Sequence, residues 1–423
     1  MRCVEPAARL RGVVEVPGDK SASHRAVLLG ALGGGPSRIE RLSGGDDVAA
    51  TVAIVRALGA SVETVGAALV IDGSAGLTPA RVPLACGNSG TTMRLVAGVV
   101  AGIAGTHRLV GDPSLSRRPM DRVAVPLRAM GAIVEGTGPR CTAPLTVEGR
   151  TTLAALDYAV PVPSAQVKSA ILLAGLAADG PTGVIEAVRT RATTETMLRA
   201  AGVRVEIADV GEGRRVRVWP GRPRPHDWYL PADPSQAAFF AVLACIHADA
   251  VLEVPDLADE PERLGFVEVL GRMGGTVTLT RRDGRAALRA VTSPLCATAV
   301  QATEIPSVDE VPALTVAAAA ARGTTVFRDV GELRVKESDR FAACIALATA
   351  LGARAWGEGD DLYVEGLGGS DRFAHVELDA GLDHRMVMAA AVAGVAGAGA
   401  CVEGAQTVTT SFPAFFDRLE ALA

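Results

Sequence analysis

The chain has 423 residues, of which 49% are hydrophobic and 21% are charged, so it can bury a large core and is not a disordered protein. Its length suggests about two to four domains. The formal net charge of −5 gives no overall positive field, which argues against binding to nucleic acid or to a membrane surface as its main role.

Cysteine usage and hydropathy predict a cytoplasmic protein with reduced thiols. The number of cysteines is odd, their spacing is wide, and no C-x-x-C motif occurs; they stand at positions 3, 86, 141, 245, 296, 344 and 401. The first 16 residues carry charges where a signal peptide needs an apolar segment. The longest uncharged apolar run, Met386 to Val402, is shorter than the about 20 residues that span a bilayer. No two histidines have metal-ligand spacing, so we expect no metal ion.

Six segments of the chain share one pattern, a polar, turn-forming opening followed by an apolar stretch of helical length. The first is GDKSASHRAVLLGAL and the second is GNSGTTMRLVAGVVAG. The openings recur every 69 to 76 residues. Each opening offers a side chain that can cap a helix by accepting hydrogen bonds from its first free N–H groups. The predicted caps are Asp19, Asn88, Ser164, Asp233, Asp309 and Asp383.

The rest of each segment predicts a larger repeat. After the apolar helix come a short strand, an amphipathic helix and two strands that open on glycine, so the unit is roughly β-α-β-α-β-β. The apolar helices are hydrophobic on nearly every face and should lie in a core. The sixth copy ends after its second helix. Strands expected between Arg2 and Glu15 could complete it, which would bring both ends of the chain into one domain.

A proline-rich segment at the chain midpoint, GRPRPHDWYLP, is the best linker candidate. Three repeats lie on each side of it. We therefore expect an α/β protein of two similar domains, one spanning 15–226 and the other 1–14 plus 227–423. Three buried helices that point the same way would give each domain a face of helix N-termini, which favours anions.

Charged and glycine-rich motifs open the predicted helices of the first half. Lys20, Ser21 and Arg25 open the first helix, where a lysine beside the helix dipole is unfavourable unless it has a partner such as an anion. The glycines and hydroxyls around Gly90 could form an anion cradle of backbone N–H groups, although the spacing is not that of a Walker A loop. Further motifs carry Arg118 (SRRP) and Ser164, Gln166 and Lys168 (SAQVKS). For each motif an ordinary cap or a solvated charge remains the alternative.

The second half places charges at the mouths of very apolar helices. Lys336, Glu337 and Arg340 lie within RVKESDR, Asp309 lies in DEVPAL, and Arg385 lies in DHRM. Charged side chains beside buried helices are energetically costly unless they form ion pairs or bind a ligand. Two anion-binding faces, many cations and a few carboxylates suggest an enzyme that joins two small anionic substrates. Composition and spacing do not name the reaction.

Seven of these motifs together resemble those of a known family. VPGDKSASHR, GNSGTTMR, the RRP of SRRPM, SAQVKSAILLAGL, the DE of IPSVDEVPAL, RVKESDR and DHRM look, in order, like the motifs of 5-enolpyruvylshikimate-3-phosphate synthases. The resemblance covers all six repeats. It implies an inverse α/β barrel-like architecture of two domains, each built from three βαβαββ units, with the active site in the cleft between the domains. It also implies the reaction of phosphoenolpyruvate with shikimate 3-phosphate to give 5-enolpyruvylshikimate 3-phosphate and phosphate.

The resemblance assigns roles motif by motif. The residues implied to hold phosphoenolpyruvate are Lys20, Gly90, Arg118, Gln166, Arg340 and Arg385. Those implied to hold shikimate 3-phosphate are Ser21, Arg25, Ser164, Gln166, Arg191, Asp309 and Lys336. Asp309 would accept the proton of the attacking hydroxyl, and Glu337, assisted by Lys336, would move the proton at the enolpyruvyl methylene carbon. Lys20 is implied to be part of the catalytic group. Gly90 is similar to the glyphosate-sensitive pattern.

The nearest alternative is a UDP-N-acetylglucosamine enolpyruvyl transferase, which shares the architecture but usually carries a reactive cysteine before R-P and a Lys-Asn opening. Here the loop reads GDPSLSRRP and the opening is Lys20-Ser21, which favours the shikimate family. An RNA-end cyclase and a non-catalytic anion-binding repeat protein are the more distant alternatives. The expected partners are the two small substrates alone, with no cofactor, and the expected state is a monomer.

Overall fold

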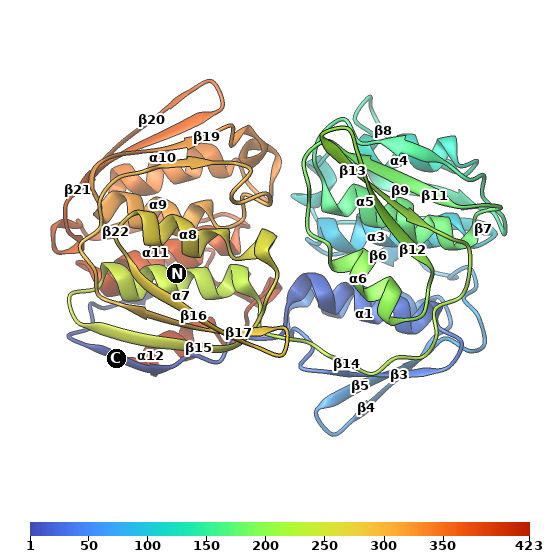
Figure 1. Cartoon of the computed structure of the whole chain (residues 1–423), viewed down its shortest axis with the longest axis horizontal. Coiled ribbons are helices and arrows are strands. Elements are labelled where there is room, and N and C mark those ends of the chain that lie inside the picture. Colours follow the sequence, from blue (N-terminus) through green and yellow to red (C-terminus); the bar gives the residue numbers. More distant parts are fainter. The chain divides into compact units, whose positions relative to one another are not determined.

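The computed structural model describes residues 1–423, which form two compact units. One unit is Gly18–Leu230, and the other combines Met1–Pro17 with Pro231–Ala423. The chain passes between them after Pro17 and after Leu230, whereas the sequence predicts boundaries after 14 and 226. Each unit is built from three α/β repeats around buried helices (Figure 1).

In the unit Gly18–Leu230, every repeat has the same sheet. An edge strand pairs in parallel with the strand that follows the first helix of the repeat. That strand pairs antiparallel with the second strand of the final hairpin, and the first strand of the hairpin forms the other edge. The sheet orders are β14-β3-β5-β4, β6-β7-β9-β8 and β10-β11-β13-β12. The strands are β3 (Pro36–Glu40), β4 (Ser61–Val65), β5 (Ala68–Asp72), β6 (Leu84–Ala85), β7 (Gly105–Val110), β8 (Ile133–Thr137), β9 (Thr142–Gly149), β10 (Asp157–Ala159), β11 (Thr182–Glu186), β12 (Val205–Val210), β13 (Gly213–Val218) and β14 (Trp228–Tyr229). The helices are α1 (Lys20–Leu32), α2 (Asp46–Ala57), α3 (Gly90–Ala101), α4 (Asp121–Ala129), α5 (Ala165–Ala174) and α6 (Thr193–Ala200).

The other unit repeats this plan in the four-stranded sheets β16-β17-β15-β2 and β18-β19-β21-β20, while its third sheet, β1-β23-β22, has three strands because β1 alone stands where the hairpin would be. Its strands are β1 (Arg2–Val4), β2 (Leu10–Val13), β15 (Ala250–Ala258), β16 (Thr276–Arg282), β17 (Arg285–Val291), β18 (Ala299–Gln301), β19 (Arg322–Arg328), β20 (Arg354–Glu358), β21 (Asp361–Leu367), β22 (Val376–Asp379) and β23 (Ala400–Glu403). Its helices are α7 (Pro234–Ile246), α8 (Gly265–Arg272), α9 (Val311–Ala320), α10 (Arg340–Ala350), α11 (His384–Ala396) and α12 (Phe415–Glu420). The family fold expected from the sequence, three βαβαββ repeats per unit, is therefore confirmed.

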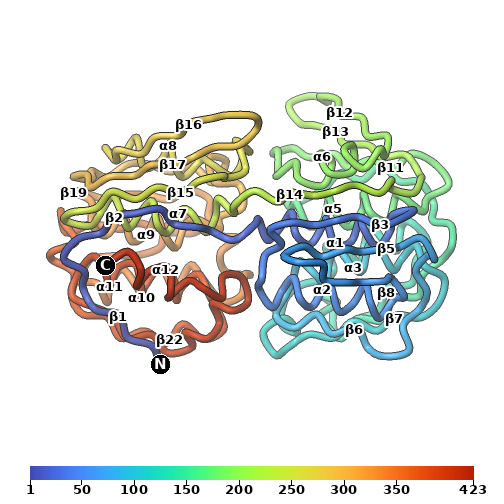
Figure 2. Tube along the Cα trace, turned by 90° about the horizontal axis from the view of Figure 1, so that it is seen from below, coloured from blue at the N-terminus to red at the C-terminus, as the bar shows by residue number.

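The N-terminal strands divide between two repeats, which corrects one expectation. β1 does join the sixth repeat, where it pairs antiparallel with β23. β2 instead pairs in parallel with β15 of the fourth repeat, as Figure 2 shows in the two tubes that run side by side. The strand that precedes α7 in the chain, β14, pairs with β3 of the first repeat. The fourth repeat therefore takes β2 as the parallel edge strand of its sheet.

The first helix of each repeat lies in the core, as its apolar composition predicts. Every residue of α7 and of α9 is buried. Helices α3 and α5 approach closely at Gly98, where an added Cβ would lie 2.3 Å from the carbonyl oxygen of Ala170. Since a side chain at Gly98 would collide with backbone, glycine allows this approach. The helices can thus be wrapped by sheets and expose little beyond their ends.

Four of the six predicted helix caps are confirmed: Asp19, Ser164, Asp233 and Asp383. The prediction is wrong for Asn88, because Ser89 caps α3 while the Asn88 amide contacts Asp112 and Arg118. It is also wrong for Asp309. The residue before α9 is Glu310, which makes no side-chain cap, and the Asp309 carboxylate forms ion pairs instead.

Cys3 and Cys401 form a disulfide, which corrects the expectation that all cysteines are reduced. The two residues lie directly opposite each other in the antiparallel pair β1 and β23. They are 398 residues apart, so spacing gave no signal of their pairing. The other five remain thiols, and burial raises the pKa of Cys86, Cys245 and Cys344 to about 12.

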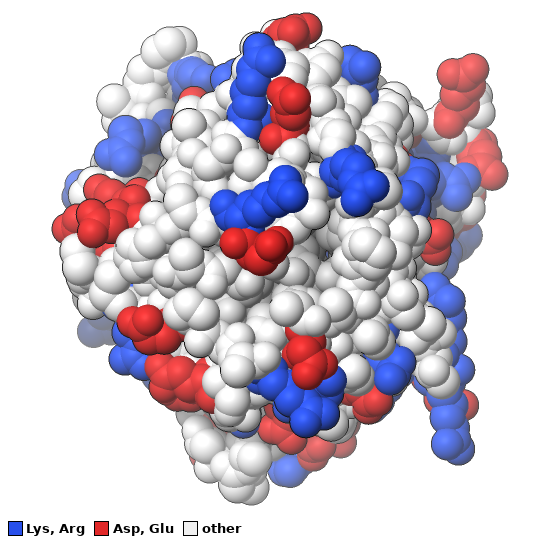
Figure 3. All heavy atoms as spheres, turned by 90° about the vertical axis from the view of Figure 1, so that its left-hand side faces the viewer, with Lys and Arg blue, Asp and Glu red and all other residues white.

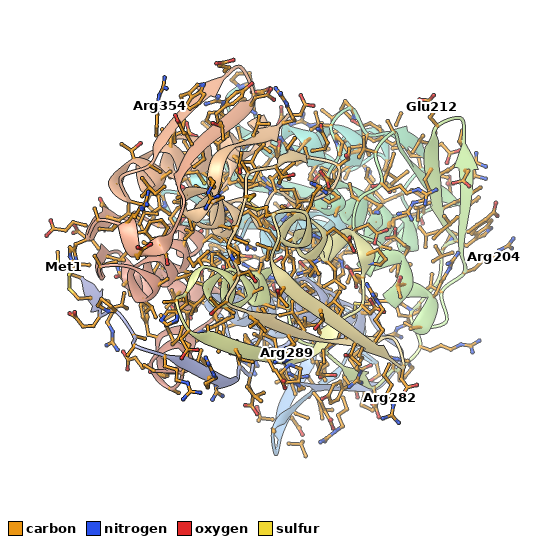
Figure 4. All side chains as sticks on the ribbon, turned by 60° about the vertical axis from the view of Figure 1, so that its left-hand side comes forward. Met1, Arg204, Glu212, Arg282, Arg289 and Arg354 are labelled. Carbon is orange, nitrogen blue, oxygen red and sulfur yellow. A yellow bond between two sulfur atoms is a disulfide. The ribbon has the colours of Figure 1, made fainter.

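The surface carries charges of both signs. On the face shown in Figure 3, basic and acidic side chains are interspersed among uncharged residues. Arginines such as Arg282, Arg289 and Arg354 extend outward from the sheets in Figure 4. None of the helices combines the length and the apolar character that a bilayer crossing requires.

The segment around β14 gives a stability prediction for the unit Gly18–Leu230. A fragment of residues 18–230 retains all three sheets, whereas 18–226 loses β14 and the buried side chains of Trp228 and Leu230, which are 8% and 2% exposed. Loss of two large buried side chains costs about 4 kcal/mol. For a unit of this size that lowers Tm by roughly 8–16 °C. Thermal unfolding followed by circular dichroism compares the two fragments.

The matched variants in the longer fragment are Trp228→Ala and Tyr229→Ala. Tyr229 is 44% exposed, so its replacement should leave Tm nearly unchanged. Equal melting temperatures for the two fragments would contradict the role of β14.

Candidate functional site

The first cluster of predicted residues lies where α1 begins. Asp19 caps this helix by accepting a hydrogen bond from the N–H of Ala22 at 2.6 Å. Lys20 follows as the first helical residue, and its ammonium lies 3.0 Å from a carboxylate oxygen of Asp47. A positive charge at a helix N-terminus is unfavourable on its own. The carboxylate of Asp47, in the first turn of α2, offsets that cost.

Ser21, Arg25 and Arg191 lie together at the same helix end. The Arg25 guanidinium donates to the carbonyl of Ser21 at 2.8 Å, and Arg191 donates to the Ser21 hydroxyl at 3.0 Å. Arg25 also donates to the hydroxyls of Ser169 and Thr194. Residues separated by about 170 positions in the chain are thereby brought to one place. Ser21 becomes a small polar residue between two guanidinium groups.

Gly90, Arg118 and Gln166 form an adjoining group. Gly90 begins α3, and an added Cβ would lie 3.0 Å from a guanidinium nitrogen of Arg94 and 3.3 Å from one of Arg118. Arg118 donates to Asn88 at 2.6 Å, and Arg94 donates to the Gln166 side chain at 2.5 Å. The absence of a side chain at Gly90 leaves both guanidinium groups close to the first turn of α3.

Hydrogen bonds between first turns show that α1, α3 and α5 begin at one end of this unit. Lys20 contacts Asp47, whose carbonyl accepts from Thr92 of α3. Gln166 of α5 donates to the hydroxyl of Thr91 at 2.9 Å. The free N–H groups of three helices and several cations therefore share one region. Such a region favours an anionic ligand.

The other unit holds a second cluster, centred on Arg340. This guanidinium is 1% exposed and faces three carboxylates. It binds Asp383 through two nitrogens at 2.8 and 3.2 Å, and it contacts Asp309 at 3.2 Å and Glu337 at 2.5 Å. Burial acts to lower the pKa of Arg340, but Asp383, Glu337 and Asp309 outweigh it and raise that pKa above its ordinary value. Arg340 is the fixed positive centre of this cluster.

Asp309 lies among three cations. Besides Arg340, Arg385 contacts its carboxylate at 3.5 Å and donates to its backbone carbonyl at 3.0 Å. The Lys336 ammonium lies 4.0 Å from the Asp309 carboxylate and donates to the carbonyl of Ser307 at 3.1 Å. The structure thus brings Asp309, Lys336, Glu337, Arg340 and Arg385 together, as the sequence motifs imply.

Sequence reasoning found the partners of these residues only in part. Asp47 was not singled out, whereas Glu310 and Asp383 were noted as charges at the ends of very apolar helices, without their partners. Glu310 is 2% exposed and accepts hydrogen bonds from Ser235 and Ser307, so it fixes the loop that leads to Asp309. Which side chains a buried acid contacts leaves no periodic signal, so only the fold reveals them. Ser164 acts as the predicted cap of α5, with its hydroxyl accepting from Val167.

Comparison with known proteins identifies the family. The protein-family model described as EPSP synthase (3-phosphoshikimate 1-carboxyvinyltransferase) matches residues 4–419 of this chain. The chain belongs to this family. It is similar to the 3-phosphoshikimate 1-carboxyvinyltransferase of Streptococcus uberis (39% identity, 98% of each chain covered) and to that of Pelotomaculum thermopropionicum (44% identity, 97% of this chain and 96% of the relative).

Solved structures agree with this assignment. EPSP synthase from Acinetobacter baumannii superimposes with a TM-score of 0.85 at 36% identity, covering 100% of this chain and 98% of that one. The enolpyruvyl transferase NikO from Streptomyces tendae has a TM-score of 0.78 at 20% identity, covers 99% of this chain and 96% of that one, and supports the fold alone. These matches favour the shikimate family over the alternatives considered from the sequence.

The surroundings of Lys336 give a pKa prediction. Burial is the largest influence and lowers the pKa of Lys336 from 10.5, although Asp309, Glu332 and Glu337 act in the opposite direction. The chain has only three lysines, at positions 20, 168 and 336. In protein labelled with [ε-13C]lysine, we expect the signal that is missing from Lys336→Arg to titrate below 10.5. A midpoint at or above 10.5 would contradict the burial argument.

The same shift predicts the sign of a stability change. Between the lowered pKa of folded Lys336 and its ordinary value, the unfolded chain binds more protons than the folded chain. The contribution of Lys336 to the free energy of unfolding therefore rises with pH in this alkaline window. Urea unfolding at a series of alkaline pH values should show this rise in the wild type relative to Lys336→Arg.

Proposed function

We propose that the protein transfers the enolpyruvyl group of phosphoenolpyruvate to the 5-hydroxyl of shikimate 3-phosphate, giving 5-enolpyruvylshikimate 3-phosphate and phosphate. The observation that carries this proposal is the full-length family match together with a carboxylate, Asp309, set among three cations. Both substrates are anions, which suits the cations and the helix N-termini of the first cluster, while the second cluster balances three cations with three carboxylates. The test is phosphate release by the purified protein when both substrates are present, with each substrate omitted in turn.

For phosphoenolpyruvate we propose a set of residues drawn from both units: Lys20, Gly90, Arg118, Gln166, Arg340 and Arg385. The close approach of two guanidinium groups to Gly90 supports a compact phosphate-binding region at the start of α3. Arg118 is 6% exposed, so its charge is poorly hydrated and favours an anion. Arg340 is 1% exposed and already faces Asp383, Asp309 and Glu337, so a substrate anion would take the place of a contact with Asp309.

For shikimate 3-phosphate we propose Ser21, Arg25, Ser164, Gln166, Arg191, Asp309 and Lys336. The hydrogen bonds that join Arg25 and Arg191 to Ser21 support a phosphate-binding group there, because a phosphate can accept from guanidinium and hydroxyl donors together.

We propose that two carboxylates handle the protons. Asp309 accepts the proton of the 5-hydroxyl as its oxygen bonds to the central carbon of phosphoenolpyruvate. Glu337, assisted by Lys336, delivers a proton to the methylene carbon and removes one again as the phosphate leaves. The close contact of Glu337 with Arg340 supports this role, because Arg340 holds the acid in one orientation. The reaction forms one carbon–oxygen bond, breaks another to release phosphate and involves no oxidation or reduction, so we propose that it needs no cofactor.

The cytoplasmic location and the monomeric state expected from the sequence remain proposals. The disulfide between Cys3 and Cys401 removes one argument for the cytoplasm, since a reduced chain was expected there.

The proton-transfer roles predict the effect of two substitutions. Asp309→Asn and Glu337→Gln keep the side-chain shape but remove the base, so kcat should fall by about 10²- to 10⁴-fold. Binding of shikimate 3-phosphate, measured by isothermal titration calorimetry, should persist. Glu253→Gln, at an exposed carboxylate paired with Arg289, is the control and should keep wild-type kcat. Near-normal turnover in either test variant would reject its role.

The position of Gly90 predicts the response to glyphosate. We expect glyphosate to compete with phosphoenolpyruvate, and Gly90→Ala to weaken glyphosate inhibition strongly, with some loss of phosphoenolpyruvate affinity, because the added Cβ lies 3.0 Å from Arg94. Inhibition constants measured at varied phosphoenolpyruvate test this. Gly271→Ala, a helical glycine with open space around it, is the control. Equal inhibition of wild type and Gly90→Ala would count against this placement.

A further inference from the structure

Four charged side chains are buried together in the unit Gly18–Leu230, close to the proposed site residues. They are Lys168 of α5, Glu186 at the end of β11, Glu195 in the first turn of α6 and Arg214 of β13. Each cation contacts both acids. The Lys168 ammonium lies 3.0 Å from Glu186 and 2.9 Å from Glu195, and the Arg214 guanidinium lies 3.3 Å and 2.9 Å from the same two acids. The sequence left open that the Lys168 ammonium extends to solvent, but the side chain is fully buried.

The two acids flank one loop, residues 187–192, which joins β11 to α6. A third attachment holds the middle of this loop. The carbonyl of Thr190 accepts from Lys168 and from Arg214, each at 3.4 Å, and the Thr190 hydroxyl donates to Glu186. Lys168 and Arg214 therefore hold the loop at both ends and at its centre.

The loop and the turn that follows carry two residues that touch the proposed shikimate-binding group. Arg191 is next to Thr190 and donates to the Ser21 hydroxyl at 3.0 Å. Thr194 is next to Glu195 and accepts from Arg25 at 2.5 Å. The positions of both guanidinium groups thus depend on a segment that the buried cluster holds in place.

The chemistry of Lys168 favours positioning over simple stabilisation. A buried ion pair contributes little net stability, because desolvation of the charges opposes their attraction. The ammonium has three N–H donors, and three acceptors surround it: Glu186, Glu195 and the carbonyl of Thr190. Lys168 is one of three lysines in a chain with 42 lysines and arginines. The Arg214 guanidinium reaches the same three acceptors from β13, so the two cations hold them together.

We propose that Lys168 and Arg214 are positioning residues for the phosphorylated shikimate substrate. By holding loop 187–192, they keep Arg191 and Arg25 in the arrangement that binds this anion. The proposal rests on the function proposed above and adds residues that do not touch the substrate.

The test measures how shikimate 3-phosphate binds to Lys168→Met, which keeps a long unbranched side chain without the charge. A small displacement of binding groups can cost up to about 10²-fold, so we expect the Kd and KM for shikimate 3-phosphate to rise about tenfold or more. The KM for phosphoenolpyruvate and kcat should change much less. Lys168→Met and Arg191→Met should be non-additive in shikimate 3-phosphate binding if Lys168 acts through Arg191.

Four further variants keep the test decisive. Lys168→Met with Glu195→Gln removes equal and opposite charges and serves if the single variant does not fold. Arg214→Lys should keep affinity for shikimate 3-phosphate, whereas Arg214→Met should lose it, because only the former retains a charged donor. Arg189→Met is the control, since Arg189 lies in the same loop but pairs with Asp209 at the surface; it should leave both KM values unchanged.

The outcomes separate this inference from the proposed function. If wild-type protein releases phosphate and binds shikimate 3-phosphate, but folded Lys168 variants keep wild-type affinity or simply add to Arg191→Met, the positioning role is wrong. If wild-type protein shows neither binding nor phosphate release, the proposed function itself fails, and this inference is rejected with it.

Discussion

The burial of one helix per repeat along nearly its whole length is the constraint on which the rest of this structure depends. A helix that is apolar on every side must be enclosed, and in each unit three small sheets provide the enclosure. The backbone N–H groups of the first turns cannot be satisfied inside the helix, so they need partners at its end. The polar and charged side chains of these helices are thereby confined to their N-terminal ends. All of the proposed site residues on the buried helices lie in or just before the first turns, except Arg25, which lies in the second turn of α1.

The charges at these mouths are held by one another in the absence of substrate. Lys20 contacts Asp47, while Arg340 contacts Asp383, Asp309 and Glu337. A buried cation without such partners would be costly. The partners also differ in role: Asp383 is fully buried and fixes Arg340 from behind, whereas Asp309 is partly exposed and can exchange its cation contacts for substrate. The same electrostatic cluster can therefore keep its geometry while one carboxylate takes part in the chemistry.

The sequence predicted the repeat and the buried helices because each leaves a periodic or local signal, and its motifs pointed to most of the charged residues that the structure gathers into the two clusters. Capping residues recur with the repeat, and the charged motifs stand at the same place in each. The failures have a common cause. Asn88 and Asp309 resemble caps locally, but distant arginines engage their side chains. β2 joined the fourth repeat because β14 pairs in the other unit, and Cys3 met Cys401 through strand pairing. These outcomes depend on contacts between segments far apart in sequence, which no local pattern encodes.

The contrast between Arg340 and Lys168 shows why two similar charges serve different purposes here. Asp383 offers Arg340 two carboxylate oxygens, and the guanidinium meets them with two nitrogens. That geometry suits the planar fork of an arginine. Around Lys168 the acceptors come from β11, from α6 and from the loop between them, and no single plane is imposed by one carboxylate. A compact ammonium can bind all three, and the Arg214 guanidinium reaches the same acceptors beside it. Arg340 also joins separate segments, because Asp309 and Glu337 contact it besides Asp383. The two-nitrogen pairing with Asp383, and not the number of segments held, is therefore what distinguishes the Arg340 site.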